Sequence, residues 1–206
     1  MWHVLVKGGW MMLPLALCSV VAVTVIIDRL FFFRGLRAEN RAEEVIGLVR
    51  KGSLHEALRV ADGTGGRKGE HMPVMRVLSA GLAHAFDPTG AMESAATREV
   101  SAMKRGLVAL DTIITLSPLL GLLGTIIGMM NAFNIMATAG LGQPHAVTGG
   151  VAEALVCTAA GISVAVVSLV PYNYFLSRVE GETDVIESYA TRLELAISAS
   201  ARERQP

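Results

Sequence analysis

The amino-acid sequence predicts an all-α membrane protein with three transmembrane helices and long cytoplasmic helical extensions. Two observations predict this class. Hydrophobic residues make up 52% of the 206 residues and charged residues only 17%, whereas soluble domains carry about a quarter charged residues. The charges also avoid three long stretches, residues 8–27, 112–152 and 154–177. A soluble enzyme is therefore not expected. The 18 basic residues balance the 18 acidic ones, so the chain has no excess positive charge that would indicate binding to nucleic acid.

The uncharged stretches have the lengths that membrane spans require. A bilayer core of about 30 Å needs about 20 apolar helical residues at about 1.5 Å each. The first and third stretches each fit one span, and the second is interrupted by turn residues at 140–144. We therefore expect spans over about residues 9–31, 113–138 and 147–176. They are helices, because the alternation of a barrel is absent.

The charges that flank these spans predict their orientation. The turn between the second and third spans has no Lys or Arg, whereas residues 28–111 hold thirteen. Because basic loops stay in the cytoplasm, we expect the N-terminus outside and the large segment and the tail inside. Asp28 and Arg29 follow the first span in place of a small-residue cleavage site, so this span is expected to be retained. The predicted parts are an N-terminus with the first span (1–33), a helical cytoplasmic region (34–111), the second span (112–139), an outer turn (140–147), the third span (148–177) and an amphipathic cytoplasmic helix (178–206).

The cytoplasmic region begins with helical patterns. Residues 37–50 are rich in Ala, Glu, Arg and Leu at helical spacing. Ser53 and Glu56 match a capping box, which predicts a short helix over about 53–61. The glycine-rich residues 63–69 are interpreted as a plain loop, because no strand precedes them and Lys68 is not followed by Ser or Thr as in a phosphate-binding loop.

Two further helices and an amphipathic stripe are expected. Pro73 opens a helix that ends near Phe86, and Asp87 with Pro88 indicates an N-cap and the first turn of the next helix. We find no stop signal after that, so one helix is expected to run from the cytoplasm into the second span. Beyond the third span, apolar residues recur at helical spacing and predict a packed face, namely Val179, Ile186, Tyr189, Leu193 and Ile197.

Small residues form stripes on the second and third spans. Residues three or four apart share one face of a helix, and small side chains there let helix backbones approach closely in lipid. On the second span the stripe contains Gly121, Gly124, Thr125 and Gly128. On the third it contains Ala154, Thr158, Gly161 (or Ile162) and Ala165. These stripes predict tight helix packing, either within the chain or between copies.

Polar residues inside these stripes are the candidates for function. Thr125 and Thr158 either donate to their own helix carbonyls four residues earlier or take part in a path for water or protons. A threonine does not titrate near neutral pH, so such a path needs a carboxylate elsewhere. Glu153 is the only formal charge between Asp111 and Arg178. It is either an anchor at the outer mouth of the third helix or a buried relay, and both interpretations stay open.

Catalytic and metal chemistry are not expected. Ser163 stands in a Gly-x-Ser-x-Ala pattern, but no histidine lies in any span to act as its base. The five histidines are scattered without metal-ligand spacing, and Cys18 and Cys157 lie in apolar runs. We therefore expect no enzyme, no metal and no cofactor.

Two motifs carry a resemblance to a known family. The segment LLGLLGTIIGM at residues 119–129 closely resembles the second-helix signature of the ExbB/TolQ branch of the MotA/TolQ/ExbB proton-channel family. The segment VAEALVCTAAG at 151–161 is similar to its third-helix signature, and PYNY at 171–174 resembles its usual close. The first span, residues 8–30, is also similar to that of the family.

The resemblance implies a multi-pass protein of the bacterial inner membrane with a periplasmic N-terminus and a cytoplasmic C-terminus. It implies a homopentamer whose second and third helices line a pore around two single-span partners of the ExbD or TolR type. Each partner brings the aspartate that takes up protons, and the work reaches the periplasm and outer membrane. The resemblance also implies a TonB- or TolA-like protein as a further partner. Thr125 and Thr158 match the pore-facing threonines of the family, and Glu153 matches its acidic residue.

Several roles remain open at this point. TonB-dependent transport, Tol-type envelope work and gliding are alternatives within the family, and a sodium-driven stator is another. A MotA-like flagellar stator is less expected, because those proteins carry four spans. Outside the family, the alternative is a purely structural helical scaffold in which the small-residue stripes only assemble helices.

Overall fold

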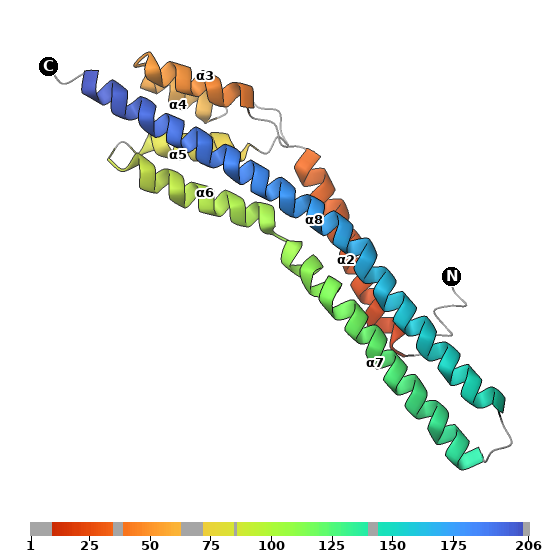
Figure 1. Cartoon of the computed structure of the whole chain (residues 1–206). Coiled ribbons are helices and arrows are strands. Elements are labelled where there is room, and N and C mark those ends of the chain that lie inside the picture. Colours follow the sequence, from red (N-terminus) through yellow and green to blue (C-terminus); the bar gives the residue numbers. More distant parts are fainter. Residues whose placement is uncertain (1–9, 35–38, 63–71, 85, 140–143, 204–206) are drawn as a thin grey trace. The chain divides into compact units, whose positions relative to one another are not determined.

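The fold consists of long helices. The computed structural model describes residues 10–34, 39–62, 72–84, 86–139 and 144–203 (Figure 1). The helices there are α2 (Met12–Arg34), α3 (Glu39–Arg50), α4 (Leu54–Ala61), α5 (Pro73–Ala83), α6 (Pro88–Lys104), α7 (Leu107–Ala139) and α8 (Pro144–Glu203), and this part of the chain has no strand. Three helical stretches are long and apolar enough to cross a membrane, Met12–Arg34, Pro88–Ala137 and Thr148–Ser200. The predicted all-α class is confirmed for the described residues, and three of their helical stretches could cross a membrane, as expected.

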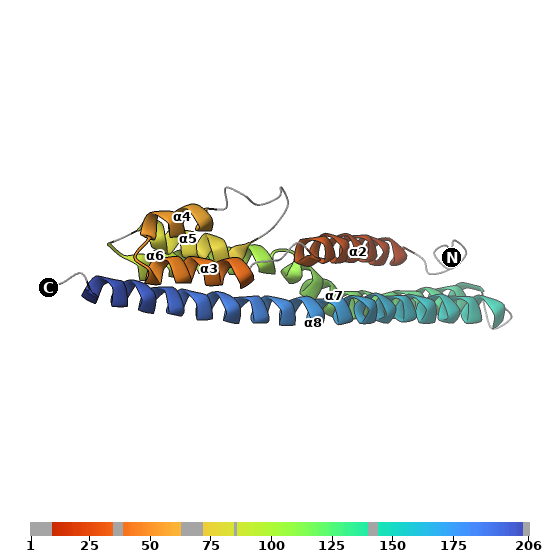
Figure 2. The same cartoon turned by 90° about the horizontal axis from the view of Figure 1, so that it is seen from above.

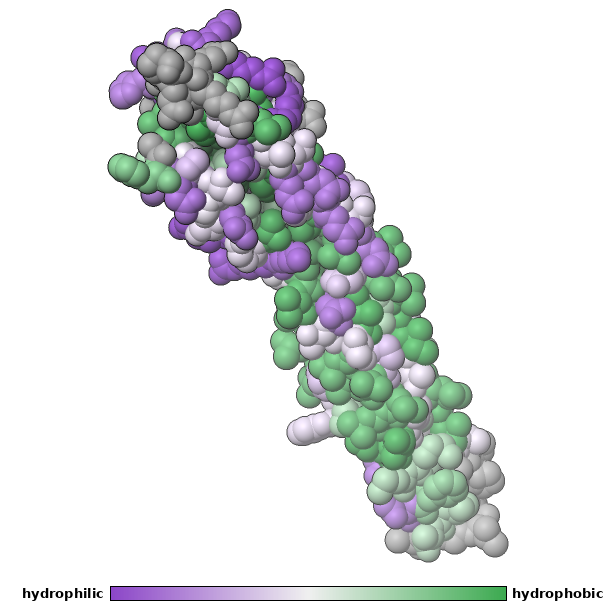
Figure 3. All heavy atoms as spheres, turned by 60° about the vertical axis from the view of Figure 1, so that its left-hand side comes forward, coloured by the Kyte–Doolittle hydropathy of each residue, from purple (hydrophilic) through white to green (hydrophobic). Residues whose placement is uncertain are grey.

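The chain divides into two compact units. The apolar unit comprises Met1–Arg29 and Gly106–Phe175, and the polar unit comprises Leu30–Arg105 and Leu176–Pro206. On the face that Figure 3 shows, hydrophobic side chains cover much of the apolar unit, and hydrophilic side chains are frequent on the polar unit. Large exposed hydrophobic residues occur on all three helices of the apolar unit, for example Leu17, Leu122 and Val166. Such a surface is unsuited to water and fits a lipid environment.

Within the apolar unit, α7 and α8 run antiparallel and side by side, and α2 packs on this pair (Figures 1 and 2). The three helices meet in a buried cluster of Met12, Leu15 and Cys157, which is surrounded by partly buried Met11, Leu120 and Ala160. Each helix therefore contributes to one small core. The rest of each span is largely open, since only 17–28% of the residues in the apolar windows are buried.

The expectation of one unbroken helix from Asp87 into the second span is wrong. Helix α6 ends at Lys104 and α7 begins at Leu107, with Arg105 as the C-cap. Gly106 has φ +82°, a left-handed conformation that L side chains adopt only at a cost. Its N-terminal neighbour Arg105 donates its backbone N–H to the Ala102 carbonyl, so the turn closes α6 locally. Gly106 is therefore the stop signal between α6 and α7, which the sequence analysis did not identify.

Replacement of Gly106 by Ala is expected to destabilise the chain. The left-handed conformation costs a non-glycine residue about 1–2 kcal/mol, and the new Cβ would lie 3.1 Å from Val25 Cγ1. We expect a lower midpoint of thermal unfolding in detergent for Gly106→Ala. The matched control is Gly181→Ala within α8, where nothing lies within 4 Å of the new Cβ. That variant should be neutral or stabilising, and equal destabilisation of both would contradict the assigned strain.

The polar unit is built on a conventional hydrophobic core. Fully buried side chains from α3 and α5 form much of it, among them Val45, Ile46, Val49, Val77 and Leu78. The stripe predicted on the last helix is confirmed. Val179, Ile186 and Leu193 are buried, and Tyr189 and Ile197 are partly buried. A spacing of seven residues brings such side chains back to the same side of a helix. One face of α8 therefore covers the core from Val179 to Leu193.

The helix ends of the polar unit agree only in part with expectation. Asp87 caps α6 as predicted, because its Oδ1 accepts the Gly90 backbone N–H at 2.9 Å and Pro88 occupies the first turn. Ser53 precedes α4, but its side chain makes no capping hydrogen bond, so the capping box is wrong. Helix α5 ends at Ala83 and not near Phe86. The loop expected at 63–69 and most of the outer turn, 140–143, lie outside the described residues.

A bidentate ion pair ties α3 to α8. The two guanidinium nitrogens of Arg192 lie 2.7 Å and 2.6 Å from the two carboxylate oxygens of Glu43. Tyr189 donates its hydroxyl to Glu43 Oε1 at 3.4 Å, and the Arg192 guanidinium lies 5.0 Å from the centre of the Tyr189 ring. The hydrogen bond from Arg192 holds the pKa of Glu43 below its ordinary value of 4.5. The carboxylate is therefore charged at neutral pH, as this ion pair requires.

The attachment of α3 is expected to weaken in acid. The pKa of Glu43 is lower in the folded chain than in the unfolded one, so its stabilising effect is present above about pH 4.5 and is lost as the pH falls through the lowered value. The protection factors of the α3 amides, which correct for the intrinsic pH dependence of exchange, should fall over that range. Arg192→Gln removes the largest cause of the lowered pKa, the hydrogen bond from Arg192, so this acid-dependent component should become smaller. An unchanged pH profile in that variant would contradict the assignment.

Candidate functional site

The candidate residues lie on the contact between α7 and α8. Residue numbers at this contact rise along α7 as they fall along α8, as expected for an antiparallel pair. A Cβ added to Gly121 would lie 3.1 Å from Thr158 Cα, and one added to Gly128 would lie 3.0 Å from Ala154 Cβ. A Cβ on Gly124 would overlap Cys157 Sγ. The glycines of α7 therefore face the small residues of α8, with no space for a larger side chain.

The same contact continues on both sides of these three glycines. A Cβ on Gly161 would lie 2.5 Å from the Ser117 carbonyl oxygen and 3.1 Å from Gly121 Cα. At the other end, a Cβ on Gly150 would lie 2.8 Å from Ala132 Cβ. The two backbones are thus in contact over several turns. Such close approach allows dispersion contacts and interhelical hydrogen bonds in lipid, where no hydrophobic effect joins helices.

Thr158 makes a hydrogen bond across this contact. Its Oγ1 donates to the backbone carbonyl of Gly121 at 3.0 Å. The interpretation in which Thr158 donates to its own helix is therefore wrong. The bond is possible because Gly121 has no side chain between its carbonyl and the neighbouring helix. Thr158 is half-buried, so part of its side chain remains accessible from outside the pair.

Thr125 lies one turn along α7 from Gly121. Its Oγ1 donates to the carbonyl of Leu122 at 2.6 Å, which is its own helix but three residues earlier and not four. Four helical residues correspond to about 6 Å along the axis. The structure therefore brings the hydroxyls of Thr125 and Thr158 to neighbouring levels of the same helix pair. Both hydroxyl protons are used in hydrogen bonds to backbone carbonyls.

Glu153 lies one residue before Ala154, on α8. Ala154 is buried against Gly128, whereas the Glu153 side chain is half-buried. Glu153 is five residues from Thr158, so the two side chains point in different directions around the helix. Ala165, the last small residue of the predicted stripe, is buried, and the alternative Ile162 is exposed. Among the described residues, no group of three or more His, Cys, Asp or Glu side chains could hold a metal ion.

Two residues of this contact escaped the sequence analysis. Cys157 is buried against Gly124 and belongs to the cluster with Met12 and Leu15, so it joins all three helices. Ser117 is completely buried, donates its hydroxyl to the Ile113 carbonyl and meets Gly161 through its own carbonyl. Ser117 could have been found, because it lies four residues before Gly121 and extends the small-residue stripe by one turn.

Comparison with known proteins places these helices in a family. Residues 71–188 match the model of the MotA/TolQ/ExbB proton channel family. The chain belongs to the MotA/TolQ/ExbB proton channel family. The matched region contains α5 to α7 and most of α8, and hence every candidate residue of the α7–α8 contact. The family is described as a channel family and not as a class of enzymes.

Two ExbB-like relatives resemble the chain over most of its length, and a TolQ protein resembles part of it. Two are from Synechocystis sp., the putative biopolymer transport proteins ExbB-like 1 and ExbB-like 3. The first is 33% identical over 196 residues, which cover 92% of this chain and 76% of the relative. The second is 35% identical over 199 residues, which cover 91% of this chain and 90% of the relative. The Tol-Pal system protein TolQ of Pseudomonas aeruginosa is 39% identical over 90 residues, 44% of this chain and 39% of TolQ.

Proposed function

We propose that the chain is the ring-forming stator subunit of a proton-driven motor in the bacterial inner membrane. Five copies surround a pore lined by α7 and α8, and a dimer of single-span ExbD- or TolR-like proteins occupies it. Protons pass between a carboxylate of this partner and the hydroxyls of Thr125 and Thr158. Their flow drives the partner relative to the ring, and the work is transmitted to the periplasm and the outer membrane. The observation that carries this proposal is the pair of hydroxyls on one glycine-packed helix pair.

The open surface of the apolar unit supports assembly into a ring. Large hydrophobic side chains on α7 and α8 stay exposed, for example Leu119 at 57%, Ile126 at 51% and Val167 at 63%. A single copy buries only a small part of each span. Lipid or further copies must therefore cover the remainder, and a closed ring covers the helix sides between subunits while it leaves an enclosed centre.

The chemistry of the α7–α8 contact supports a partner with an acid. Threonine hydroxyls accept and donate hydrogen bonds but do not titrate near neutral pH. Glu153 is the only carboxylate between Asp111 and Arg178, and it points in a different direction from Thr158. A proton path through these hydroxyls thus requires a titrating group from another polypeptide. A single-span protein with one membrane carboxylate fits this requirement, because an ionisable residue at mid-membrane is costly unless it is functional.

The names of the relatives support the transport role and its location. ExbB-like proteins are described as biopolymer transport proteins and TolQ as part of the Tol-Pal system. We propose the same kind of task for this chain, with the N-terminus in the periplasm and the C-terminus in the cytoplasm. A TonB- or TolA-like protein would then receive the work, either for TonB-dependent transport or for Tol-type envelope work.

Reconstitution tests this proposal. The chain is purified with and without a single-span ExbD- or TolR-like protein and is placed in liposomes with a pH-sensitive dye. We expect proton flux only when both proteins are present, five copies of the chain by native mass spectrometry, and no dependence on sodium. If no single-span protein is retained, or if the chain alone leads to the same flux, the chain is a scaffold or a different channel. A flux that requires sodium would assign the sodium-driven alternative.

A further inference from the structure

The outer side of α6 carries a basic stripe. Ser94 and Arg98 are exposed and four residues apart, and exposed Arg105 follows seven residues later at the C-cap. They share one face of the helix. Arg98 lies along this face, because its guanidinium donates to the Ser94 hydroxyl and its Nε to the Ser94 carbonyl, both at 3.3 Å. Within the described part of the chain, neither Arg98 nor Arg105 reaches a carboxylate, so both charges are available to a partner.

The outer side of α8 carries the opposite charge. Glu180 and Asp184 are four residues apart and exposed, and exposed Ser188 continues the same face. The ion pairs in the described residues do not include Glu180 or Asp184. The buried face of α8, with Val179 and Ile186, points away from this acidic stripe. The polar unit therefore presents one purely basic and one purely acidic stripe, and its own fold joins neither to the other.

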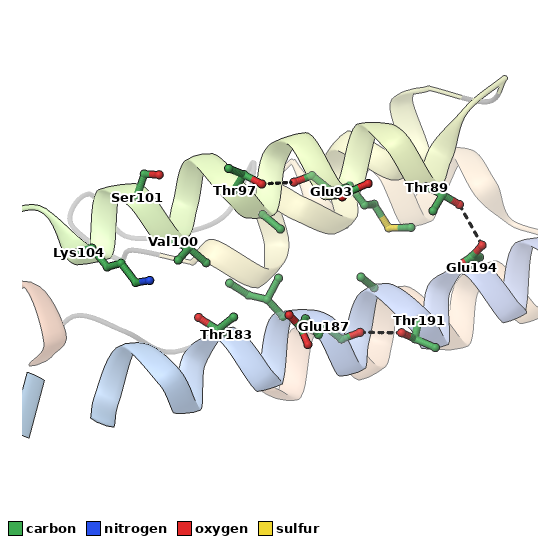
Figure 4. Close-up of a pocket in the computed structure, with 14 residues that line it drawn as sticks. Thr89, Glu93, Thr97, Val100, Ser101, Lys104, Thr183, Glu187, Thr191 and Glu194 are labelled. Atoms are coloured by element: carbon green, nitrogen blue, oxygen red, sulfur yellow. Dashed lines mark hydrogen bonds between the residues drawn. The ribbon is translucent and has the colours of Figure 1, made fainter. Parts of the chain in front are cut away.

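A hydrogen bond gives the register between these two helices. Thr89 Oγ1 donates to Glu194 Oε1 at 3.0 Å, at one end of a groove of about 710 Å³ between α6 and α8 (Figure 4). The two helices rise equally per residue and run in opposite directions. Arg98 lies nine residues after Thr89, and nine residues before Glu194 is Val185, next to Asp184. Arg105 lies sixteen residues after Thr89, and sixteen residues before Glu194 is Arg178, which is two residues from Glu180. Each arginine is thus level with a carboxylate.

We infer that α6 of one copy docks against α8 of the next copy, with Arg98 paired to Asp184 and Arg105 to Glu180. Rotation about a ring axis does not shift a copy along that axis. Residues of α6 and α8 that are level within one chain are therefore also level between neighbouring copies. The two stripes are different surfaces, which is the requirement of a head-to-tail contact that closes a ring. This inference rests on the proposed ring and identifies the surfaces that join its subunits outside the apolar unit.

A second copy explains the two stripes better than other occupants do. A basic peptide would satisfy only the acidic stripe, and an anionic lipid surface would satisfy only the basic one. The same chain supplies both charges at matching levels and in equal number. Exposed ion pairs are individually weak and are screened by salt, so these contacts select the neighbour and its register more than they provide affinity.

Mixed disulfides test the contact directly. One tagged copy carries Arg98→Cys and a second, differently tagged copy carries Asp184→Cys, both with Cys18→Ser and Cys157→Ala, and they are co-expressed with the single-span protein. We expect an oxidised dimer that contains both tags, with a yield that falls in 1 M salt. The control replaces Arg98→Cys by Lys51→Cys, an exposed position in the turn after α3, and should give no mixed dimer. Absence of the Arg98–Asp184 dimer from an assembled ring overturns the inference.

A charge exchange tests it with the native cysteines in place. Arg98→Glu and Asp184→Arg should each lower the fraction of assembled rings at low salt, by at most about fivefold for one exposed pair, and the double variant should restore it. Additive losses in the double variant overturn the inference, as does an Arg98→Glu effect seen only in binding to anionic vesicles. Rings that conduct protons without this coupling would leave the proposed function intact. A chain that neither assembles nor conducts would overturn both.

Discussion

We expect replacement of Thr158 by Val to lower proton flux through the reconstituted complex by about a hundredfold or more, the scale of losing a positioned proton-transfer group. Valine has nearly the shape of threonine but cannot donate or accept a hydrogen bond. Among the described residues, the hydrogen bond that this change removes is the one to the Gly121 carbonyl. In membranes such bonds contribute about 0.6 kcal/mol on average, so the ring should still assemble. The measurement is flux per assembled ring.

Two variants serve as controls for this result. Thr158→Ser keeps the hydroxyl and should retain most of the flux. Thr24→Val removes a hydroxyl that donates to the Val20 carbonyl at 2.8 Å on the exposed side of α2, and should have no effect. Thr125→Val is expected to reduce flux as Thr158→Val does. Normal flux in the Thr125→Val and Thr158→Val double variant would show that protons take another path.

The second large effect is expected at Gly161. A methyl group there would lie 2.5 Å from the Ser117 carbonyl oxygen and 3.1 Å from Gly121 Cα. Both are backbone atoms, so α7 and α8 would have to move apart. Overpacking of this kind costs about 1–3 kcal/mol, and Gly161→Ala should unfold earlier in a detergent titration and lose flux. Gly149→Ala is the matched control on the same helix, because nothing lies within 4 Å of its new Cβ. Equal stability of the two variants would contradict the described packing.

Gly124 offers a complementary test of the same contact. Its new Cβ would overlap the sulfur of Cys157, a side-chain atom and not backbone. Gly124→Ala should therefore be destabilising alone and partly rescued by Cys157→Ala, which removes that atom. The coupling free energy from this double-mutant cycle separates a direct contact from a general loss of helix stability. Additive effects would mean that the two residues do not touch.

The features predicted correctly were those that depend on neighbouring residues in sequence. Charge-free stretches located the three apolar helices, since burial in lipid excludes charge wherever it occurs. The Asp87 cap is confirmed because the side chain bonds a backbone N–H only three residues later. The stripe at Val179, Ile186 and Leu193 is confirmed, because residues seven apart on one helix point to the same face.

Some of the features that were missed depend on contacts between helices, whereas the Ser53 cap is a local feature that was also predicted wrongly. Gly106 looks like Gly121 or Gly124 in the sequence, but it ends a helix, and its φ of +82° is adopted beside Val25 of another helix. The acceptor of Thr158 could not be predicted for the same reason. Its own helix offered a carbonyl at the usual spacing, and only the register of α7 against α8 brings the bare Gly121 backbone within reach. The small-residue stripes indicated a close contact but not which residues face each other.

The Thr158 hydroxyl has a single proton, and in this structure that proton is committed to main-chain oxygen. The oxygen of Thr158 therefore presents only lone pairs to whatever approaches it. A protonated acid or a water molecule can bind there at once, whereas a bare carboxylate finds no donor until the side-chain torsion turns. In the proposed motor, the resting Thr158 side chain would therefore bind the protonated form of the partner's acid in preference to the ionised form.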